Sequence, residues 1–206
     1  MVSRCLASKY DKVRDRKKLL LGVFLVLCWC GNEACAQDVA VKTNLLYWAT
    51  TTPNLGMEIG LGKQTTLDIS GGYNPWTLDK AANKKIKHWL VVPELRYWLC
   101  ERFNGHFFGL HTGYGFYNIG GIRIPFHDKA TADRRYQGWA TGVGVSYGYS
   151  WILGKRWNIE ANVGVGYVYT HYDQYDCVTC GQYRGTRSKH LFLPTRAGIS
   201  LVYIIK

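Results

Sequence analysis

The chain has 206 residues, which is enough for one ordinary domain and marginal for two. Aromatic residues make up 15% of the sequence, and it contains 23 glycines but only 5 prolines. This composition favours an all-β protein with tight turns over a helical bundle or a disordered chain. The formal net charge is +12.

The first 36 residues have the features of a signal peptide. A stretch rich in lysine and arginine precedes an apolar run, Leu19–Trp29, and the tripeptide Ala34-Cys35-Ala36 fits the pattern that signal peptidase recognises. The alternative is a membrane anchor, but about 11 residues at ~1.5 Å each fall short of the ~30 Å hydrocarbon core. We predict a signal peptide at 1–36, cleaved after Ala36, and one domain at 37–206. Cleavage lowers the net charge from +12 to +8, because it removes seven basic and three acidic residues.

Eight segments of alternating apolar and polar residues follow, and this alternation predicts β-strands. Their connections differ: those after the second, fourth and sixth segments are short, whereas those after the third, fifth and seventh are long and polar. Short turns at one end and long loops at the other are typical of an outer-membrane barrel. Only the connection after the first segment, 51–54, is short where a long one is expected. The predicted strands are 39–50, 54–62, 65–75, 87–99, 106–118, 138–152, 157–171 and 189–205.

The two faces of each predicted strand differ in side-chain size. In 138–152, large residues such as Val143 and Val145 share one face, and the other face is glycine and serine. A soluble barrel fills its interior with bulky apolar groups, whereas a membrane barrel turns them outward to lipid. Rows of glycine suit the crowded interior of a narrow eight-stranded barrel. We therefore expect the apolar face to lie outside.

Seven charged side chains fall on the glycine-rich faces. Inside the barrel they can pair, whereas on the lipid face an Arg or Lys costs ~2–4 kcal/mol at mid-bilayer. Seven solvated surface charges are the alternative. The predicted interior network comprises Lys42, Glu58, Asp68, Glu94, Arg96, Glu160 and Arg196.

Aromatic residues mark both ends of two predicted strands. Trp139 and Trp151 lie at opposite ends of one, and Trp157 and Tyr169 at opposite ends of the next. Trp and Tyr favour both membrane–water interfaces, so this spacing predicts two aromatic girdles. The alternative is that these rings form the core of a β-sandwich.

Four stretches carry a resemblance to a known family: VKTNLLYWATTTPNLGMEIGLGKQTTLDISGGYNPW (41–76), WLVVPELRYWL (89–99), GYSWILGKRWNIEANVGVGYVYT (148–170) and GISLVYIIK (198–206). They resemble the Bacteroidetes family called domain of unknown function 3575 (DUF3575), among small OmpA-like outer-membrane barrels. The resemblance implies a barrel without established chemistry. It also implies a surface role, because some members lie near fimbria genes. The ending Ile204-Ile205-Lys206 departs from the aromatic terminus of many such barrels.

The last long connection contains Cys177 and Cys180, flanked by His171 and His190. Export to an oxidising compartment favours a disulfide between the two cysteines at the loop tip. The alternatives are a zinc site formed by the four side chains, or a redox role. Cys100 lies at the opposite end of the predicted barrel, where we expect a free thiol.

The long connections are basic. Basic outer loops can contact the anionic phosphates of surface glycolipid, and loops that are merely solvated are the alternative. Nucleic acid is a poor partner for a chain displayed in a membrane. The basic loop residues are Lys80, Lys84, Lys85, Lys129, Arg134 and Arg135.

Together these features predict an exported, monomeric, eight-stranded antiparallel transmembrane β-barrel of the outer membrane. Its lumen is filled by side chains, so a general pore is not expected. We expect a structural or surface-interaction role, with lipid and surface glycolipid or a fimbrial or other surface protein as partners, and no cofactor. The alternatives are a lipid-modifying outer-membrane enzyme and a soluble ligand-binding β-barrel. An enzyme is not favoured, because no Ser–His–acid grouping is visible from the spacing.

Overall fold

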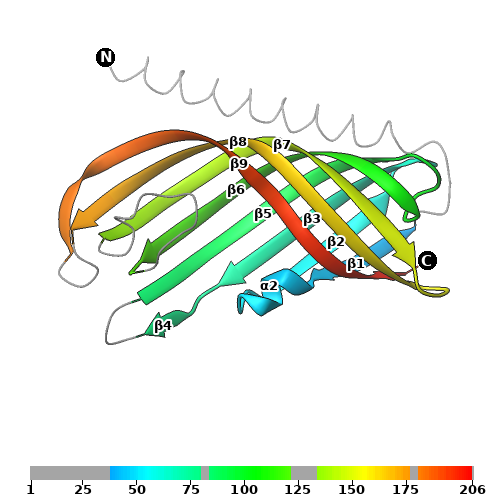
Figure 1. The fold of residues 1–206 in the computed structure, drawn as a ribbon, viewed down its shortest axis with the longest axis horizontal. Helices are drawn as coiled ribbons and strands as arrows, with labels where there is room; N and C mark the ends of the chain where they lie inside the picture. Colours follow the sequence, from blue (N-terminus) through cyan, green and yellow to red (C-terminus); the bar gives the residue numbers. More distant parts are fainter. Residues whose placement is uncertain (1–37, 80–83, 122–133, 177–180, 206) are drawn as a thin grey trace, which may run out of the picture. The chain divides into compact units, whose positions relative to one another are not determined.

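The computed structural model describes residues 38–79, 84–121, 134–176 and 181–205. Most of these residues lie in antiparallel strands, and one short helix interrupts them (Figure 1). In this part of the chain, no helix has the length and hydrophobicity needed to cross a bilayer. The elements are β1 (Val39–Asn44), α2 (Leu45–Ala49), β2 (Asn54–Gly60), β3 (Thr65–Asn74), β4 (Thr77–Asp79), β5 (Lys84–Trp98), β6 (Gly105–Gly120), β7 (Arg134–Ile152), β8 (Trp157–Asp176) and β9 (Gln182–Ile204).

Eight of these strands form a closed antiparallel ring. The order around the ring is β1, β2, β3, β5, β6, β7, β8 and β9, and β9 pairs back onto β1. The short β4 pairs with β5 beside the ring. The predicted all-β fold with eight antiparallel strands is therefore confirmed. The three short connections, 61–64, 99–104 and 153–156, also occur as expected.

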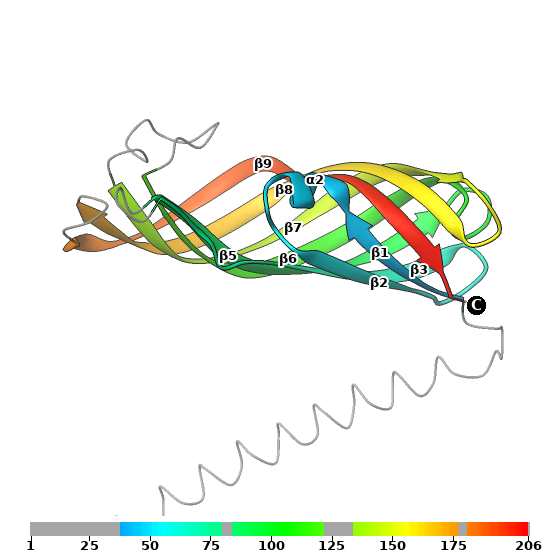
Figure 2. The same cartoon turned by 90° about the horizontal axis from the view of Figure 1, so that it is seen from below.

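The prediction of the first strand is wrong for the second half of that strand. β1 ends at Asn44, and residues 45–49 form the helix α2 instead of continuing the strand to residue 50. Asn44 caps this helix, because its side-chain oxygen accepts the backbone N–H of Leu46 at 3.0 Å. Connection 45–53 is therefore longer than the predicted four-residue turn, and α2 lies where β1 ends and β2 begins (Figure 2).

The strands on the other side of the ring are longer than predicted. β7 begins at Arg134, β8 runs to Asp176 and β9 begins at Gln182, so only 177–181 connect β8 to β9. Ion pairs hold these polar strand ends together: Arg184 Nε lies 2.6 Å from Asp176 Oδ2. Polar residues occupy both faces here, and for this reason the apolar alternation did not reveal the strands.

The apolar face of the sheet is its outer face. Val143, Val145 and Val163 are 52%, 57% and 62% exposed. Their neighbours on the opposite face are buried, as for Ser146 on β7 and Asn162 on β8. Around these residues the interior therefore holds small and polar side chains.

Glycines in the interior allow neighbouring strands to approach closely. A Cβ atom at Gly166 would lie 2.6 Å from the Val143 carbonyl oxygen and 2.8 Å from the Gly144 Cα atom. Real Cβ atoms are not found at such distances, so any side chain at Gly166 must displace the backbone of β7. The glycine rows therefore permit the tight curvature of the ring.

Candidate functional site: an ion-pair network inside the ring

Arg96, on β5, is the centre of a buried ion-pair network. Its Nη1 atom lies 3.0 Å from Glu58 Oε2 and 2.8 Å from Glu160 Oε2. Its Nη2 atom lies 3.1 Å from Glu94 Oε2 and 3.5 Å from Asp68 Oδ2. One guanidinium thus contacts all four acids, which come from β2, β3, β5 and β8. The side chain of Arg96 is fully buried.

Two further cations complete the network from β1 and β9. Lys42 pairs with Glu58 and lies 3.4 Å from Asp68 Oδ1 and from Glu160 Oε2. Arg196 Nη2 lies 2.8 Å from Asp68 Oδ2 and 2.5 Å from Glu94 Oε2. The structure therefore brings together the seven charged side chains named from the sequence: Lys42, Glu58, Asp68, Glu94, Arg96, Glu160 and Arg196.

Polar side chains that the sequence reasoning missed satisfy the outer oxygens of the acids. Thr66 donates to Glu58, Ser146 donates to Glu94, and Asn162 Nδ2 donates to Glu160 Oε1 at 3.0 Å. Ser70 accepts from Arg196 at 3.1 Å. These residues share the inward parity of the charged residues, so the same alternation rule could have found them.

The network has a structural consequence that follows from its composition. It contains three cations and four carboxylates, and six of the seven residues are at most 6% exposed. Burying each ion carries a desolvation penalty of several kcal/mol, which multiple partners and hydrogen bonds offset. Removing one partner therefore leaves an uncompensated buried charge, and the strands that carry the network depend on one another.

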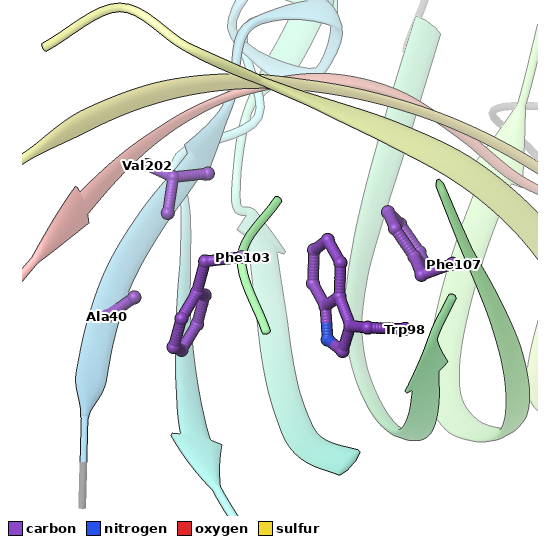
Figure 3. Packing of buried hydrophobic residues seen from close by; sticks show 5 residues of the cluster. All are labelled: Ala40, Trp98, Phe103, Phe107 and Val202. Carbon is purple, nitrogen blue, oxygen red and sulfur yellow. The ribbon is translucent and has the colours of Figure 1, made fainter. Parts of the chain in front are cut away.

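An apolar cluster lies between the network and the short turns, and it closes that end of the ring. It consists of Ala40, Trp98, Phe103, Phe107 and Val202 (Figure 3). Arg96 joins the two layers, since its Cζ atom lies 4.4 Å from the centre of the Phe107 ring. Trp98 Nε1 donates to Thr66 at 2.9 Å. The sequence reasoning did not identify this cluster.

Phe103 belongs to the turn between β5 and β6, yet it is only 5% exposed. It has a positive φ of 63°, which is uncommon outside glycine. Its carbonyl oxygen accepts from Asn158 Nδ2 at 2.6 Å and from Ser150 at 3.1 Å. Beside it, Arg102 Nη2 lies 2.7 Å from Asp38 Oδ2. This turn therefore folds into the interior and plugs that end of the ring.

A small pocket of about 50 Å³ borders the other side of the network, next to Tyr47 of α2 and Leu90 of β5. Three buried polar atoms of residues in its wall have no hydrogen-bond partner among the described residues: Asp68 Oδ1, Arg96 Nε and Arg196 Nε. A polar pocket of this kind suits water or a small polar solute.

The predicted cysteine and zinc site falls largely outside the described residues, because 177–180 are not among them. His171 and His190 lie on β8 and β9. Nδ1 of His171 contacts Ser188 Oγ at 2.9 Å, and Nδ1 of His190 contacts the Tyr167 hydroxyl. The described residues contain no group of three or more His, Cys, Asp or Glu placed to hold a metal ion. Cys100 is exposed and is a free thiol.

The basic residues assigned to loops lie partly in strands. Lys84 and Lys85 begin β5, and Arg134 and Arg135 begin β7, because the strands extend further than predicted. Arg135 also stacks on Tyr175, with 4.1 Å between Cζ and the ring centre. The other two residues, Lys80 and Lys129, lie outside the described residues.

The fold and the site together define a class: a closed antiparallel ring with an apolar exterior and an ion-paired, plugged interior. The chain belongs to the family described as "Protein of unknown function (DUF3575)", which matches residues 22–205. No curated protein and no solved structure matches the chain.

Proposed function

We propose that the ring is an exported outer-membrane β-barrel with a structural or surface-interaction role and no general pore. The observation that carries this proposal is the reversal of polarity: the apolar side chains face outward and the charges face inward. Soluble monomers rarely expose an apolar surface larger than a few hundred Å². In a bilayer the same surface contacts hydrocarbon, and the paired charges avoid it.

The dimensions of the apolar surface fit a bilayer. On β7 it runs from Trp139 to Trp151, and on β8 from Tyr169 to Trp157. Both pairs are twelve positions apart in the sequence. At ~3.3 Å per residue and a tilt of ~40°, this separation corresponds to about 30 Å, close to the thickness of the hydrocarbon core. The aromatic residues at its two ends then lie at the two interfaces.

The filled interior supports a role other than general transport. The apolar cluster around Phe103 and the ion-pair network around Arg96 occupy successive layers of the ring. An eight-stranded barrel is only wide enough to be filled by its own side chains. We propose that the function is carried by the outer surface and the outer end of the ring, with surface glycolipid and a surface protein, fimbrial or other, as partner classes.

The same proposal includes an export signal at 1–36 that is cleaved after Ala36. It also includes location in a Bacteroidetes outer membrane and a monomeric state. Heat-modifiable gel mobility of the detergent-extracted protein is the expected result, because folded outer-membrane barrels resist unfolding by detergent until heated. Nitroxide labels give a second test: a label at Val143 should be accessible to oxygen in lipid, and a label at Ser146 should not. The opposite accessibility would overturn the proposal.

Mass spectrometry of lipid A separates the structural role from a lipid-modifying enzyme. A strain that lacks the gene should show the lipid A of its parent strain under the structural proposal. A missing acyl chain or phosphate, restored when the gene is returned, would favour the enzyme instead.

A further inference from the structure

One side of the ring is much shorter than the other, and this leaves a strand edge without a partner. β9 has 23 residues, but β1 pairs only with Ser200–Ile204. Among the described residues, the stretch from Gln182 to Ile199 therefore pairs with β8 on one side and with no strand on the other. In Figures 1 and 2, β7, β8 and β9 extend far beyond the ends of β1 and β2.

The free edge offers backbone hydrogen bonds. Ile204 donates its backbone N–H to Arg156 on the β8 side, and Ile205 donates to Val39 on the β1 side. Backbone groups therefore alternate between the two sides of β9. The pairing slips by one residue beside Pro194, which reverses the alternation, and it slips again between Gly185 and Tyr183. Even-numbered residues from Thr186 to Phe192 consequently direct their N–H and C=O groups to the free side.

Pro194 divides this edge into two parts. It has no N–H, so it cannot take part fully in a new ladder, and proline inside a sheet is confined to edges and bulges. The part from Gln182 to Leu193 contains no proline. Phe192, at the end of this part, is 77% exposed, more than any other large apolar side chain among the described residues. An exposed edge of this length is a template for strand addition.

The charge of the edge indicates what can pair with it. Gln182–Leu193 contains Arg184, Arg187 and Lys189 and no acidic residue. Arg184 is paired with Asp176, and Arg187 is exposed. If two copies of this stretch paired antiparallel about Ser188, Arg187 of one copy would lie opposite Lys189 of the other. Like charges directly opposite each other are destabilising, so a second copy is disfavoured.

We propose that the edge at Thr186–His190 binds an extended, acidic segment of another protein by strand addition. This inference rests on the proposed function, which places β9 outside the membrane up to His190, the residue that pairs with Tyr169 at the end of the apolar belt. Backbone hydrogen bonds from Ser188 and His190 supply the ladder, and an acidic side chain of the partner lies beside the exposed Arg187. On the other face, the partner packs apolar or hydroxyl side chains beside Ser188 and His190.

The test uses the full-length protein in detergent and a fluorescent peptide of about twelve residues. Ligands of this kind bind as a single extended strand. In this peptide Glu alternates with Thr and Val; the comparison peptide carries Lys in place of Glu. Anisotropy should show binding of the Glu peptide at least about tenfold tighter than of the Lys peptide, and S188P should weaken it about tenfold, a difference of ~1.4 kcal/mol. S188A, which keeps the backbone N–H, should bind like the wild type.

A charge-reversal variant provides a second test if S188P does not fold. R187E changes no backbone donor, and it should weaken the Glu peptide and strengthen the Lys peptide. Equal binding of both peptides to the wild type, or no binding of either, overturns the inference. A dimer in sedimentation that S188P converts to a monomer also overturns it, in favour of self-pairing. Heat-modifiable mobility is a separate readout, so failure here is distinguishable from failure of the proposed function.

Discussion

Arg96 Nη1 lies 2.8 Å from Glu160 Oε2, so a residue of β5 and a residue of β8 meet inside the ring. These strands are not neighbours, because β6 and β7 lie between them. The contact therefore links opposite walls, which backbone hydrogen bonds between adjacent strands cannot do. It explains why the interior needs long charged side chains on some strands and glycines on others.

The first prediction concerns the loss of Arg96. R96M leaves four buried carboxylates with two cations, and breaking a buried charge network in this way costs about 3–5 kcal/mol. We expect a lower urea midpoint and a lower temperature for the gel-mobility shift. R96K keeps the charge but loses the planar guanidinium that bridges the acids, so its loss should be smaller. A wild-type midpoint for R96M would show that the network does not stabilise the ring.

The second prediction concerns the plug formed by Phe103. F103A removes a buried aromatic ring and should cost about 3–5 kcal/mol of unfolding free energy. E101A alters an exposed residue of the same turn and should have little effect. Single-channel recording in planar bilayers adds a second measurement, in which F103A should raise conductance above that of E101A. Equal stability of the two variants would contradict the assignment of this turn as a plug.

The third prediction compares two glycines that differ in their surroundings. A methyl group at Gly166 meets the β7 backbone, whereas one at Gly154 meets nothing within 4 Å. G166A should therefore destabilise the protein by about 1–3 kcal/mol, the usual range for overpacking. G154A should be nearly neutral in the same denaturation experiment. If both variants unfolded at the same urea concentration, the close approach of β7 and β8 would not need glycine.

The fourth prediction tests contact with lipid at Val163, which is 62% exposed. In folding experiments with lipid vesicles, V163R should lose about 2–4 kcal/mol, since this position lies near the middle of the proposed membrane belt. V163L keeps an apolar side chain and should lose less than about 1 kcal/mol. An arginine tolerated as well as leucine would indicate that water, and not hydrocarbon, covers this face.

Alternation of residues along each strand carried most of the prediction of the fold. In β5, Glu94 and Arg96 share one parity and Val91 and Leu95 the other. The structure places the charged parity inside and the apolar parity outside. The rule failed where local capping by Asn44 turned the chain into α2. It also failed for the far ends of β8 and β9, where polar residues occupy both faces.

The sequence predicts which charged residues belong to the candidate site, but it does not predict how they are arranged. Parity alone selected the seven charged residues, since each strand contributes alternate residues to the interior. It did not show that Arg96 is the centre of the network, because the register between strands fixes which side chains reach one another. Phe103 was missed because it belongs to a turn, and periodicity does not describe how a turn folds into the interior.

The sequence by itself determined the number of strands in the ring and which residues each strand turns to either face, because side chains alternate with a period of two. Only the tertiary structure decided the pairing of the charges, the plug at Phe103 and the unequal lengths of the walls. These features depend on register and ring closure, which bring together residues distant in the chain, such as Lys42 and Glu160. The free edge of β9 has the same origin, because it exists only where β1 ends at Asn44 and β9 continues.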